Sequence, residues 1–287
     1  MSVYAVTGSA SGMGRQAAEK LRAAGHTVIG VDLRDAEVAA DLSGPDGRAA
    51  AAEQVLARCG GSLDGAVLAA GLGPKPGPGM ARTIFEVNFR GVVDLLDAWR
   101  PALAAAERAK VVVIGSNSST TIPAVPRRAV RALLAGRTAS AVRTVKLLGP
   151  AAPSMAYGAS KIAVTRWARR QAVTPEWAGA GIRLNVLAPG AIQTPLLDEL
   201  LAIPQQAKAV QAFPVPVGGF GDPAMLADWM LFMLSDAAEF LCGSVIFVDG
   251  GTDAYFRSDD WPRSLGVSGV PRYLMRLRSF RGASHGG

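Results

Sequence analysis

The stretch VYAVTGSASGMGRQAAEKLRAAGHTVIGVD, residues 3–32, decides the fold of this chain. Its apolar ends predict strands at 3–6 and 27–32, and the Ala-, Glu- and Leu-containing segment between them predicts a helix at 14–24. A strand, a glycine-rich loop, a helix and a second strand in this order are typical of the first unit of a doubly wound α/β fold. The glycines of the loop are Gly8, Gly12 and Gly14.

The glycine-rich loop and the end of the second strand together predict a dinucleotide site. Glycines let the backbone come close to a pyrophosphate, and the helix that follows presents free N–H groups to it. Asp32 ends the second strand, 18 residues after Gly14. A carboxylate there accepts hydrogen bonds from the adenosine ribose and repels a 2′-phosphate, which favours NAD over NADP. The alternatives are that Asp32 only forms a turn, or that Arg34 binds a phosphate.

The rest of the chain continues the alternation of strands and helices. Four further strands are predicted at 65–70, 110–115, 182–188 and 244–249. Four further helices are predicted at about 46–58, 82–106, 155–178 and 223–234. The strands are apolar almost throughout, which is typical of strands buried on both faces of a parallel sheet. We therefore predict a single-domain, Rossmann-type doubly wound parallel sheet of the α/β class.

Two segments and a tail lie outside this alternation. Residues 118–153, rich in Arg, Ala and Leu, predict a helical insertion before the helix that carries Tyr157. Residues 191–221 predict a lid that runs into the Pro- and Gly-rich sequence FPVPVGGFGDP. We expect one domain at 1–256, followed by a basic tail at 257–287.

The composition excludes several classes of protein. Of the 287 residues, 49% are hydrophobic and 18% charged, which is enough for a large core and unlike a disordered chain. No run of about 18 apolar residues occurs, so we expect no membrane span. MSVYAVTG has no signal-peptide pattern, and Cys59 and Cys242 are too few for a disulfide framework, so we expect a cytoplasmic protein. His26 and His285 do not supply a metal-ligand set, so no metal is expected.

The net charge of +7 suggests an acidic partner, and its location matters. The tail at 257–287 holds six arginines against Asp259 and Asp260, a net charge of +4. The tail lacks the interleaved aromatic residues and the motif of a nucleic-acid-binding arm. We therefore expect a solvated or subunit-contacting tail on a mildly basic body, with neither nucleic acid nor a membrane as partner.

The segment SMAYGASKIAVTRWARR, residues 154–170, places a tyrosine and a lysine four residues apart. Residues at this spacing share one face of a helix, and an ammonium group beside a phenol favours the phenolate. Lys161 is thereby predicted to lower the pKa of Tyr157 from about 10, so that the tyrosine serves as an acid and base. The alternative is a core tyrosine beside a lysine that reaches the surface.

Seven short motifs follow one another along the chain. They are TGSASGMG (7–14), AAG (69–71), VNFRG (87–91), VVVIGS (111–116), YGASK (157–161), NVLAPGAIQTP (185–195) and VDGG (248–251). Together they resemble the short-chain dehydrogenase/reductase family over residues 1 to about 254. GVDLRDAEVAADLS (30–43), AGLGP (70–74) and the 41-residue interval from Ser116 to Tyr157 are similar to its bacterial 3α-hydroxysteroid dehydrogenase/carbonyl reductase branch.

The resemblance implies four catalytic residues, Asn88, Ser116, Tyr157 and Lys161. Tyr157 would exchange the proton with the substrate oxygen, and Ser116 would orient that oxygen. Lys161 would bind the nicotinamide ribose and lower the pKa of the tyrosine. Asn88 would hold a helix kink and a water.

The resemblance also implies the residues that hold the dinucleotide. They are Gly8, Ser11, Gly12, Met13, Gly14, Asp32, Leu33, Asp41, Leu42, Ala70, Gly71, Tyr157, Lys161, Pro189, Gly190, Ile192 and Thr194. The GSNSST segment offers Ser118 and Ser119 as alternatives for the catalytic serine. A position just past the strand end favours Ser116.

These residues predict an NAD-dependent oxidoreductase that transfers a hydride between the nicotinamide and a secondary alcohol or ketone. The mostly apolar lid favours a hydrophobic substrate, and the branch resemblance implies a 3α-hydroxysteroid or another carbonyl compound. The lid leucines could instead be the core face of a helix. The competing functions are action on a terpenoid alcohol or 3-oxoacyl substrate, and a non-catalytic dinucleotide-binding regulator.

The resemblance finally implies a homodimer or homotetramer, formed through the helices that carry Asn88 and Tyr157. The insertion at 118–153 precedes the second of these helices. We expect the insertion to cap or alter that interface.

Overall fold

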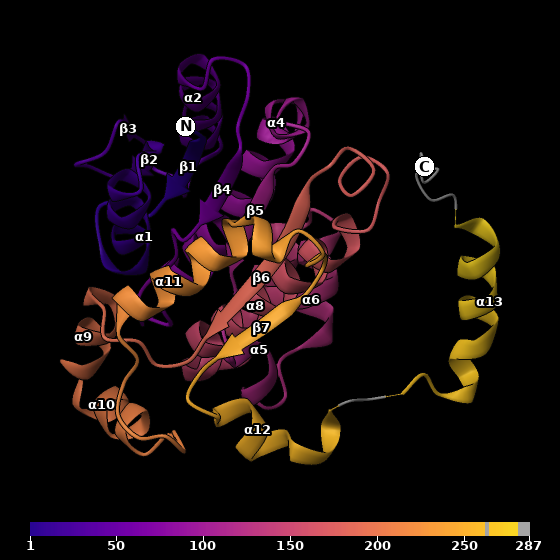
Figure 1. Cartoon of the computed structure of the whole chain (residues 1–287). Coiled ribbons are helices and arrows are strands. Elements are labelled where there is room, and N and C mark those ends of the chain that lie inside the picture. The colour runs from indigo at the N-terminus through magenta and orange to yellow at the C-terminus, as the bar shows by residue number, and fades with distance from the viewer. Residues whose placement is uncertain (262–263, 281–287) are drawn as a thin grey trace.

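The computed structural model describes residues 1–261 and 264–280, which form one parallel β-sheet with helices on both faces (Figure 1). Its strands lie in the order β3-β2-β1-β4-β5-β6-β7, so the strand order reverses between β1 and β4. They are β1 (Val3–Thr7), β2 (Thr27–Asp32), β3 (Val38–Ala39), β4 (Gly65–Leu68), β5 (Lys110–Ile114), β6 (Arg183–Pro189) and β7 (Val245–Val248). The predicted Rossmann-type sheet is confirmed. Arg263, Arg281 and His285, which the sequence analysis placed in the tail, lie outside the described residues.

Two helical layers cover the sheet because β4 and β5 are apolar and buried on both faces. One layer contains α2 (Pro45–Arg58), α4 (Gly91–Ala105) and α8 (Ala152–Gln171), and the larger hydrophobic core lies beneath it. The other contains α1 (Gly12–Ala23) and α11 (Pro223–Leu234), which pack against each other over a second core.

Three elements differ from the sequence prediction. The strand β3 was not predicted, because two residues are too few to show an apolar pattern. The helix predicted at 82–106 consists of α3 (Met80–Phe85), a π-helical turn (Glu86–Arg90) and α4. The helix predicted at 155–178 ends earlier, at Gln171, and the chain then turns at Gly181, which has φ +80°.

The insertion at 118–153 is helical and packs on α8 and α3. It contains α5 (Ser118–Thr121), α6 (Arg127–Leu134), α7 (Thr138–Lys146) and a 3-10 turn (Gly149–Ala151). Val130, Leu133 and Val145 are buried in the larger core, so the insertion covers the outer side of the helix that carries Tyr157.

The last third of the chain holds the predicted lid and the tail. The elements are α9 (Pro195–Leu201), α10 (Pro204–Gln211), a 3-10 turn (Asp236–Ala238), α12 (Thr252–Arg257), 3-10 turns at Ser258–Asp260 and Val267–Gly269, and α13 (Val270–Ser279). Figure 1 shows α13 apart from the sheet and its helical layers. Within the described residues, no helix combines the length and apolar character that crossing a membrane requires.

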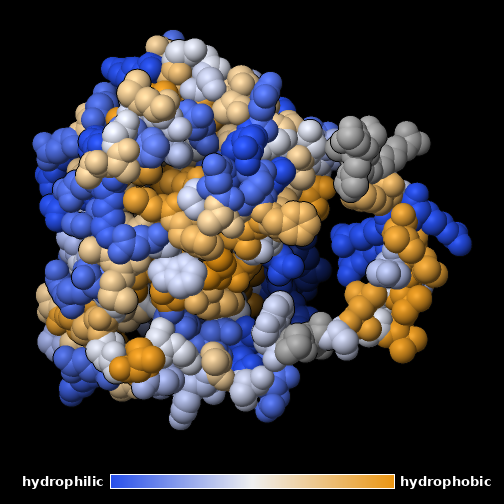
Figure 2. Space-filling view, viewed as in Figure 1, coloured by the Kyte–Doolittle hydropathy of each residue, from blue (hydrophilic) through white to orange (hydrophobic). Residues whose placement is uncertain are grey.

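One face of the molecule exposes apolar side chains over α11 and β7, as Figure 2 shows. Met225, Trp229 and Phe232 lie along one side of α11 and are 60%, 40% and 45% exposed. The four residues of β7 are only partly buried. An exposed apolar surface of this kind is typical of a contact site.

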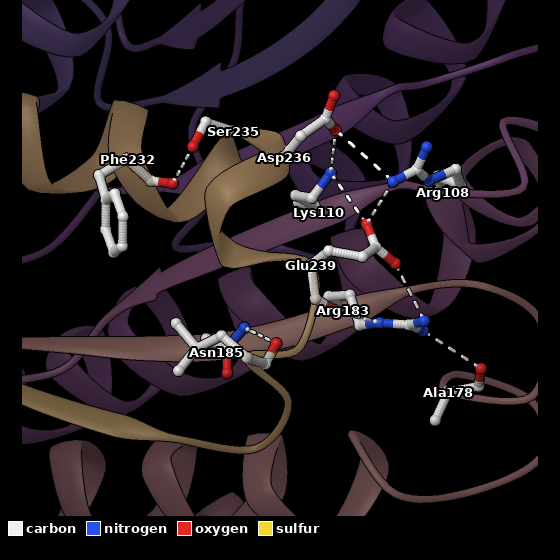
Figure 3. A network of polar contacts seen from close by, with 10 residues as sticks. Arg108, Lys110, Ala178, Arg183, Asn185, Phe232, Ser235, Asp236 and Glu239 are labelled. Atoms are coloured by element: carbon white, nitrogen blue, oxygen red, sulfur yellow. Dashed lines mark hydrogen bonds and ion pairs between the residues drawn. The ribbon is translucent and has the colours of Figure 1, made fainter.

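The amino ends of β5 and β6 carry a network of charged side chains (Figure 3). The buried Lys110 has its Nζ 3.2 Å from Asp236 Oδ1 and 3.3 Å from Glu239 Oε2. Arg108 and Arg183 lie 3.3 Å and 3.1 Å from the same Glu239 carboxylate. Burial acts to raise the pKa of Glu239, but Lys110, Arg183 and Arg108 outweigh it and lower that pKa. The network ties the segment after α11 to the sheet.

Candidate active site

The candidate site lies at the carboxyl ends of the central strands, beside the reversal between β1 and β4. Ligands bind at this edge of open α/β sheets. A cavity of about 400 Å³ opens there, lined by residues from the end of β5, from α8, from the loop after β4 and from the lid. The lining is largely apolar with a few polar groups, which is typical of a small-molecule site.

The glycine-rich loop between β1 and α1 packs closely against neighbouring backbone. Gly8 has φ +69°, and a Cβ there would lie 2.8 Å from the backbone nitrogen of Ala70. A Cβ on Gly14 would collide with the carbonyl of Gly8. Within the described chain, the Ser11 side chain does not cap α1, so the first N–H groups of this helix are available to an anion.

The adenosine end predicted from the sequence is built around Asp32. Its Oδ2 accepts a hydrogen bond from the Ala10 N–H at 2.9 Å, and its Oδ1 accepts one from the Leu33 N–H at 2.7 Å. The carboxylate is thereby held against the glycine-rich loop, with further lone pairs free for hydroxyl donors. Just after β3, Leu42 is buried and Asp41 is exposed.

The loop after β4 passes close to two of the predicted catalytic residues. The Ala70 N–H donates to Thr7 Oγ1 at 3.1 Å, which fixes the start of the loop. A Cβ on Gly71 would lie 3.4 Å from Asn88 Oδ1 and 3.8 Å from Lys161 Nζ. The loop therefore passes beside both Asn88 and Lys161, of which Lys161 lines the cavity.

Asn88 lies in the π-helical turn between α3 and α4 and is 1% exposed. Its Oδ1 accepts from the Leu72 N–H at 2.8 Å, and its Nδ2 donates to the Leu72 carbonyl at 2.9 Å and to Ser160 Oγ at 3.3 Å. The side chain thus ties the loop after β4 to α8. Such π-turns frequently occur at functional sites.

Tyr157 and Lys161 face the same cavity from successive turns of α8. The Lys161 Nζ lies 5.9 Å from the centre of the Tyr157 ring and donates to the Ile114 carbonyl at 2.9 Å. Burial lowers the pKa of Lys161 to about 8. Burial also raises the pKa of Tyr157, while the side chains of Ser116 and Ser118 act in the opposite direction.

The prediction that Lys161 lowers the pKa of Tyr157 is therefore wrong for the protein alone. Removal from water disfavours the charged form of both groups, so the phenol is harder to ionise and the ammonium easier to neutralise. The two serine hydroxyls, and not the lysine, favour the phenolate here.

The structure distinguishes the three serines that follow β5. Ser116 and Ser118 are buried and line the cavity, whereas Ser119 is only partly buried and is not part of the described lining. Ser116 Oγ accepts a hydrogen bond from the Ser118 N–H at 3.1 Å. Ser116 therefore lies where the sequence analysis placed it, with Ser118 beside it.

The predicted nicotinamide end lies on the far side of the cavity, after β6. The predicted cofactor residues that line the cavity are Met13, Gly71, Tyr157, Lys161, Pro189, Gly190, Ile192 and Thr194. Thr194 donates from Oγ1 to the Ile192 carbonyl at 3.2 Å and accepts from the Leu197 N–H at 3.4 Å, so it caps α9. The other predicted site residues lie outside the lining, namely Gly8, Ser11, Gly12, Gly14, Asp32, Leu33, Asp41, Leu42, Ala70 and Asn88.

The apolar part of the lining was not predicted from the sequence. It includes Leu72, Ile122, Leu196, Leu197, Leu200, Val210 and Phe213. These residues come from the loop after β4, the insertion and the lid, and only the apolar character of the lid signalled them. An ion pair between Lys75 and Glu199 links the loop after β4 to α9.

These features fit a bound dinucleotide. A side chain would not fit at Gly8 or Gly14, so only glycine suits these positions. The first N–H groups of α1 adjoin the same loop, where a pyrophosphate would lie. Asp32 presents a carboxylate beside the glycine-rich loop, and the cavity lined by Met13, Tyr157 and Lys161 opens at the same edge of the sheet.

Comparison with known proteins agrees with this arrangement. Residues 8–253 match the family described as Enoyl-(Acyl carrier protein) reductase. The 3-alpha-hydroxysteroid dehydrogenase/carbonyl reductase of Comamonas testosteroni is 39% identical over 257 residues, which cover 90% of this chain and 98% of the relative. The cis-4-hydroxycyclohexanecarboxylate dehydrogenase of Sinomonas cyclohexanicum is 32% identical over 270 residues, which cover 88% of this chain and 96% of the relative.

A solved structure has the same fold. The 3-alpha-hydroxysteroid dehydrogenase from Pseudomonas sp. B-0831, complexed with NADH, matches with a TM-score of 0.84 and 44% identity, over 90% of this chain and 99% of the other. The chain belongs to the short-chain dehydrogenase/reductase family. The similarity to the 3α-hydroxysteroid dehydrogenase/carbonyl reductase branch, predicted from the motifs, is confirmed as well.

Proposed function

We propose that this chain is an NAD-dependent oxidoreductase that transfers a hydride between the nicotinamide and a secondary alcohol or ketone. The observation that carries this proposal is one apolar cavity lined jointly by Ser116, Tyr157 and Lys161 at the carboxyl edge of the sheet. The names of the relatives, which are dehydrogenases and reductases, support it.

The proposed roles follow from the positions of the side chains. In alcohol oxidation the Tyr157 oxygen takes the proton of the substrate hydroxyl, and in ketone reduction it returns that proton. Ser116 donates a hydrogen bond to the same substrate oxygen and orients it. Lys161, whose ammonium lies beside the loop after β4, binds the nicotinamide ribose, and Asn88 holds this loop in place. NAD, when bound, would supply the hydride acceptor for oxidation, and its oxidised nicotinamide ring would place a positive charge near the phenol.

NAD is proposed over NADP because Asp32 ends β2 with its carboxylate turned to the glycine-rich loop. A 2′-phosphate would meet this negative charge. The NADH named with the Pseudomonas structure supports the same choice.

The proposed substrate is a hydrophobic secondary alcohol or ketone, with a 3α-hydroxysteroid as the first candidate. The apolar lining from the lid supports this, and so do the names of two relatives. The second candidates are cyclic or terpenoid alcohols and 3-oxoacyl compounds. The cyclohexane ring named for the Sinomonas relative supports the cyclic alcohols.

The test is a panel of steroid, terpenoid and aliphatic alcohols, read by NADH absorbance with NAD and with NADP. Tyr157→Phe is expected to lower kcat by about 10²–10⁴-fold on every active substrate, because it removes the acid and base. Tyr255→Phe is the matched control, since this exposed tyrosine is not part of the described cavity lining. Unchanged turnover in Tyr157→Phe would exclude this mechanism, and no turnover of any substrate by wild type would favour a dinucleotide-binding regulator.

We also propose a homodimer or homotetramer whose usual helical interface is altered by the insertion. The insertion packs on α8 and contains Arg127, Arg128, Arg131, Arg137, Arg143 and Lys146 but no acidic residue. Its net charge is +6, so the positive charge of the body at 1–256 is concentrated in the insertion. Two such surfaces would repel each other.

The apolar side of α11 supports a contact elsewhere on the molecule. Trp229→Glu is expected to lower the mass found by analytical ultracentrifugation, whereas Arg131→Glu on the insertion leaves it unchanged. The opposite result would favour an interface through the insertion. We further propose a cytoplasmic protein with a catalytic domain at 1–256 and a tail at 257–287, consistent with the free thiols of Cys59 and Cys242.

A further inference from the structure

We propose that Ser118 is a positioning residue, a second hydroxyl that holds the Tyr157 oxygen and stabilises its ionised form while Ser116 turns to the substrate. This inference rests on the proposed function. It assigns a role to a residue that the family resemblance left only as an alternative to Ser116.

The position of Ser118 carries the first part of the argument. Ser118 begins α5, is 7% exposed and lines the cavity together with Ser116 and Tyr157. Its N–H donates to Ser116 Oγ at 3.1 Å. The two serines therefore form one unit at the end of β5, and both line the same cavity as the phenol.

The hydroxyl of Ser118 has no hydrogen-bond partner of normal geometry among the described residues, although it is buried. A buried hydroxyl without a partner is costly. Two other hydroxyls of α5 are satisfied, because Thr120 and Thr121 donate to the Asn117 carbonyl at 2.9 Å and 3.0 Å. Ser118 thus keeps a donor that the fold itself does not use, on the side of the cavity.

The chemistry of the site gives this donor a task. Ser116 must donate its hydrogen bond to the substrate oxygen during the proposed reaction. It therefore cannot donate to the Tyr157 oxygen throughout. A phenolate oxygen accepts more than one hydrogen bond, and donors to the charged form favour that form. Both serines act to lower the pKa of Tyr157, against the effect of burial. Ser118 is the one that does not have to turn to the substrate.

The charged groups around Tyr157 do not replace this role. Lys161 carries the only charge in the described lining of the cavity, and its ammonium already donates to the Ile114 carbonyl. At the end of β7, Asp249 accepts from Asn117 Nδ2 at 3.4 Å. On the π-helical turn, Glu86 pairs with Arg48 at 3.1 Å, and Arg90 pairs with Asp94.

The test compares Ser118→Ala, Ser118→Thr and the matched control Ser119→Ala. The pH profile of kcat/KM for alcohol oxidation is measured in each, and the Tyr157 phenolate is titrated by ultraviolet absorbance against Tyr157→Phe. Ser118→Ala is expected to shift the acid limb and the titration upwards by about one pH unit, and to lower kcat/KM about tenfold near neutral pH. At a pH above the Tyr157 pKa of both proteins, the kcat/KM of Ser118→Ala approaches that of wild type. Ser118→Thr and Ser119→Ala keep the wild-type profile.

Two outcomes would overturn the inference. One is a Ser118→Ala enzyme with an unshifted acid limb and an unshifted titration. The other is an equal loss of kcat/KM at every pH, which indicates a structural defect. In either outcome, the proposed function still holds if wild type is active and Tyr157→Phe is inactive. An inactive wild type would instead count against the proposed function itself.

Discussion

The two edges of the sheet each bury a lysine, but they surround it with different partners. At the amino edge, Lys110 is 4% exposed and its ammonium contacts the carboxylates of Asp236 and Glu239 (Figure 3). At the carboxyl edge, Lys161 is 6% exposed and donates to the carbonyl of Ile114. No carboxylate within the described residues forms an ion pair with Lys161.

The difference separates a structural lysine from a chemical one. A buried ammonium that faces carboxylates is neutralised by the fold, and removing its partners destabilises the protein. A buried ammonium without a carboxylate has a lowered pKa and is left to interact with a ligand. Burial alone therefore does not identify the active site of this protein, whereas burial without a charged partner does.

The largest expected effect comes from Lys161→Met. Activity should fall by about 10²–10⁴-fold, because the site loses the ammonium beside Tyr157 and the nicotinamide ribose. The free energy of unfolding should not fall, because a desolvated cation without a carboxylate is removed. Steady-state kinetics and urea unfolding of the same preparation measure both. A loss of stability with activity retained would reverse the comparison.

The opposite pattern is expected at the amino edge. Asp236→Asn combined with Glu239→Gln should lower the free energy of unfolding by about 3 kcal/mol, since it leaves the Lys110 ammonium buried without a carboxylate. Specific activity of the folded protein should stay near wild type. Adding Lys110→Met is the control, and it should restore most of the lost stability in urea unfolding. If it restores none, charge burial is not the cause.

A smaller effect is expected at the carboxyl edge, in the pH dependence of the free energy of unfolding. The pKa of Lys161 is about 8 in the folded protein against 10.5 ordinarily, so the unfolded chain binds more protons between these values. Stability contributed by this group therefore rises with pH across that window. From pH 8 to pH 10, wild type should gain about 2 kcal/mol relative to Lys161→Met in urea unfolding. A constant difference between the two proteins would mean that the lysine is not desolvated.

The smallest expected effect is the acid response of Glu239. Its pKa is lowered in the fold, so its contribution is present above the ordinary carboxyl pKa and is lost as the pH falls through the folded value. Glu239→Gln should cost about 1 kcal/mol at pH 7, because the carboxylate is partly exposed to solvent. The difference from wild type should vanish in acid, as followed by thermal unfolding from pH 7 to pH 3. A difference that persists in acid would point to packing and not to charge.

The local pattern of the chain was sufficient to predict most of the fold. The continuous apolar runs predicted β1, β2 and β4 to β7, and the glycines before α1 predicted the dinucleotide loop, because these features depend on neighbouring residues only. The strand β3 could not be predicted, because it is set by contacts with distant parts of the chain. The family resemblance, and not the local pattern, implied a helix kink at Asn88, where the structure has a π-helical turn.

The same division applies to the candidate site. Sequence alone determined that Tyr157 and Lys161 share a helix face and that Asp32 follows a glycine-rich loop, because spacing along one element fixes these relations. Tertiary structure decided that burial raises the pKa of Tyr157, that Ser118 lies beside Ser116 in the cavity, and that Lys110 is paired whereas Lys161 is not. Loss of water and the nearness of partners depend on which distant segments meet, and no local pattern in the chain records that.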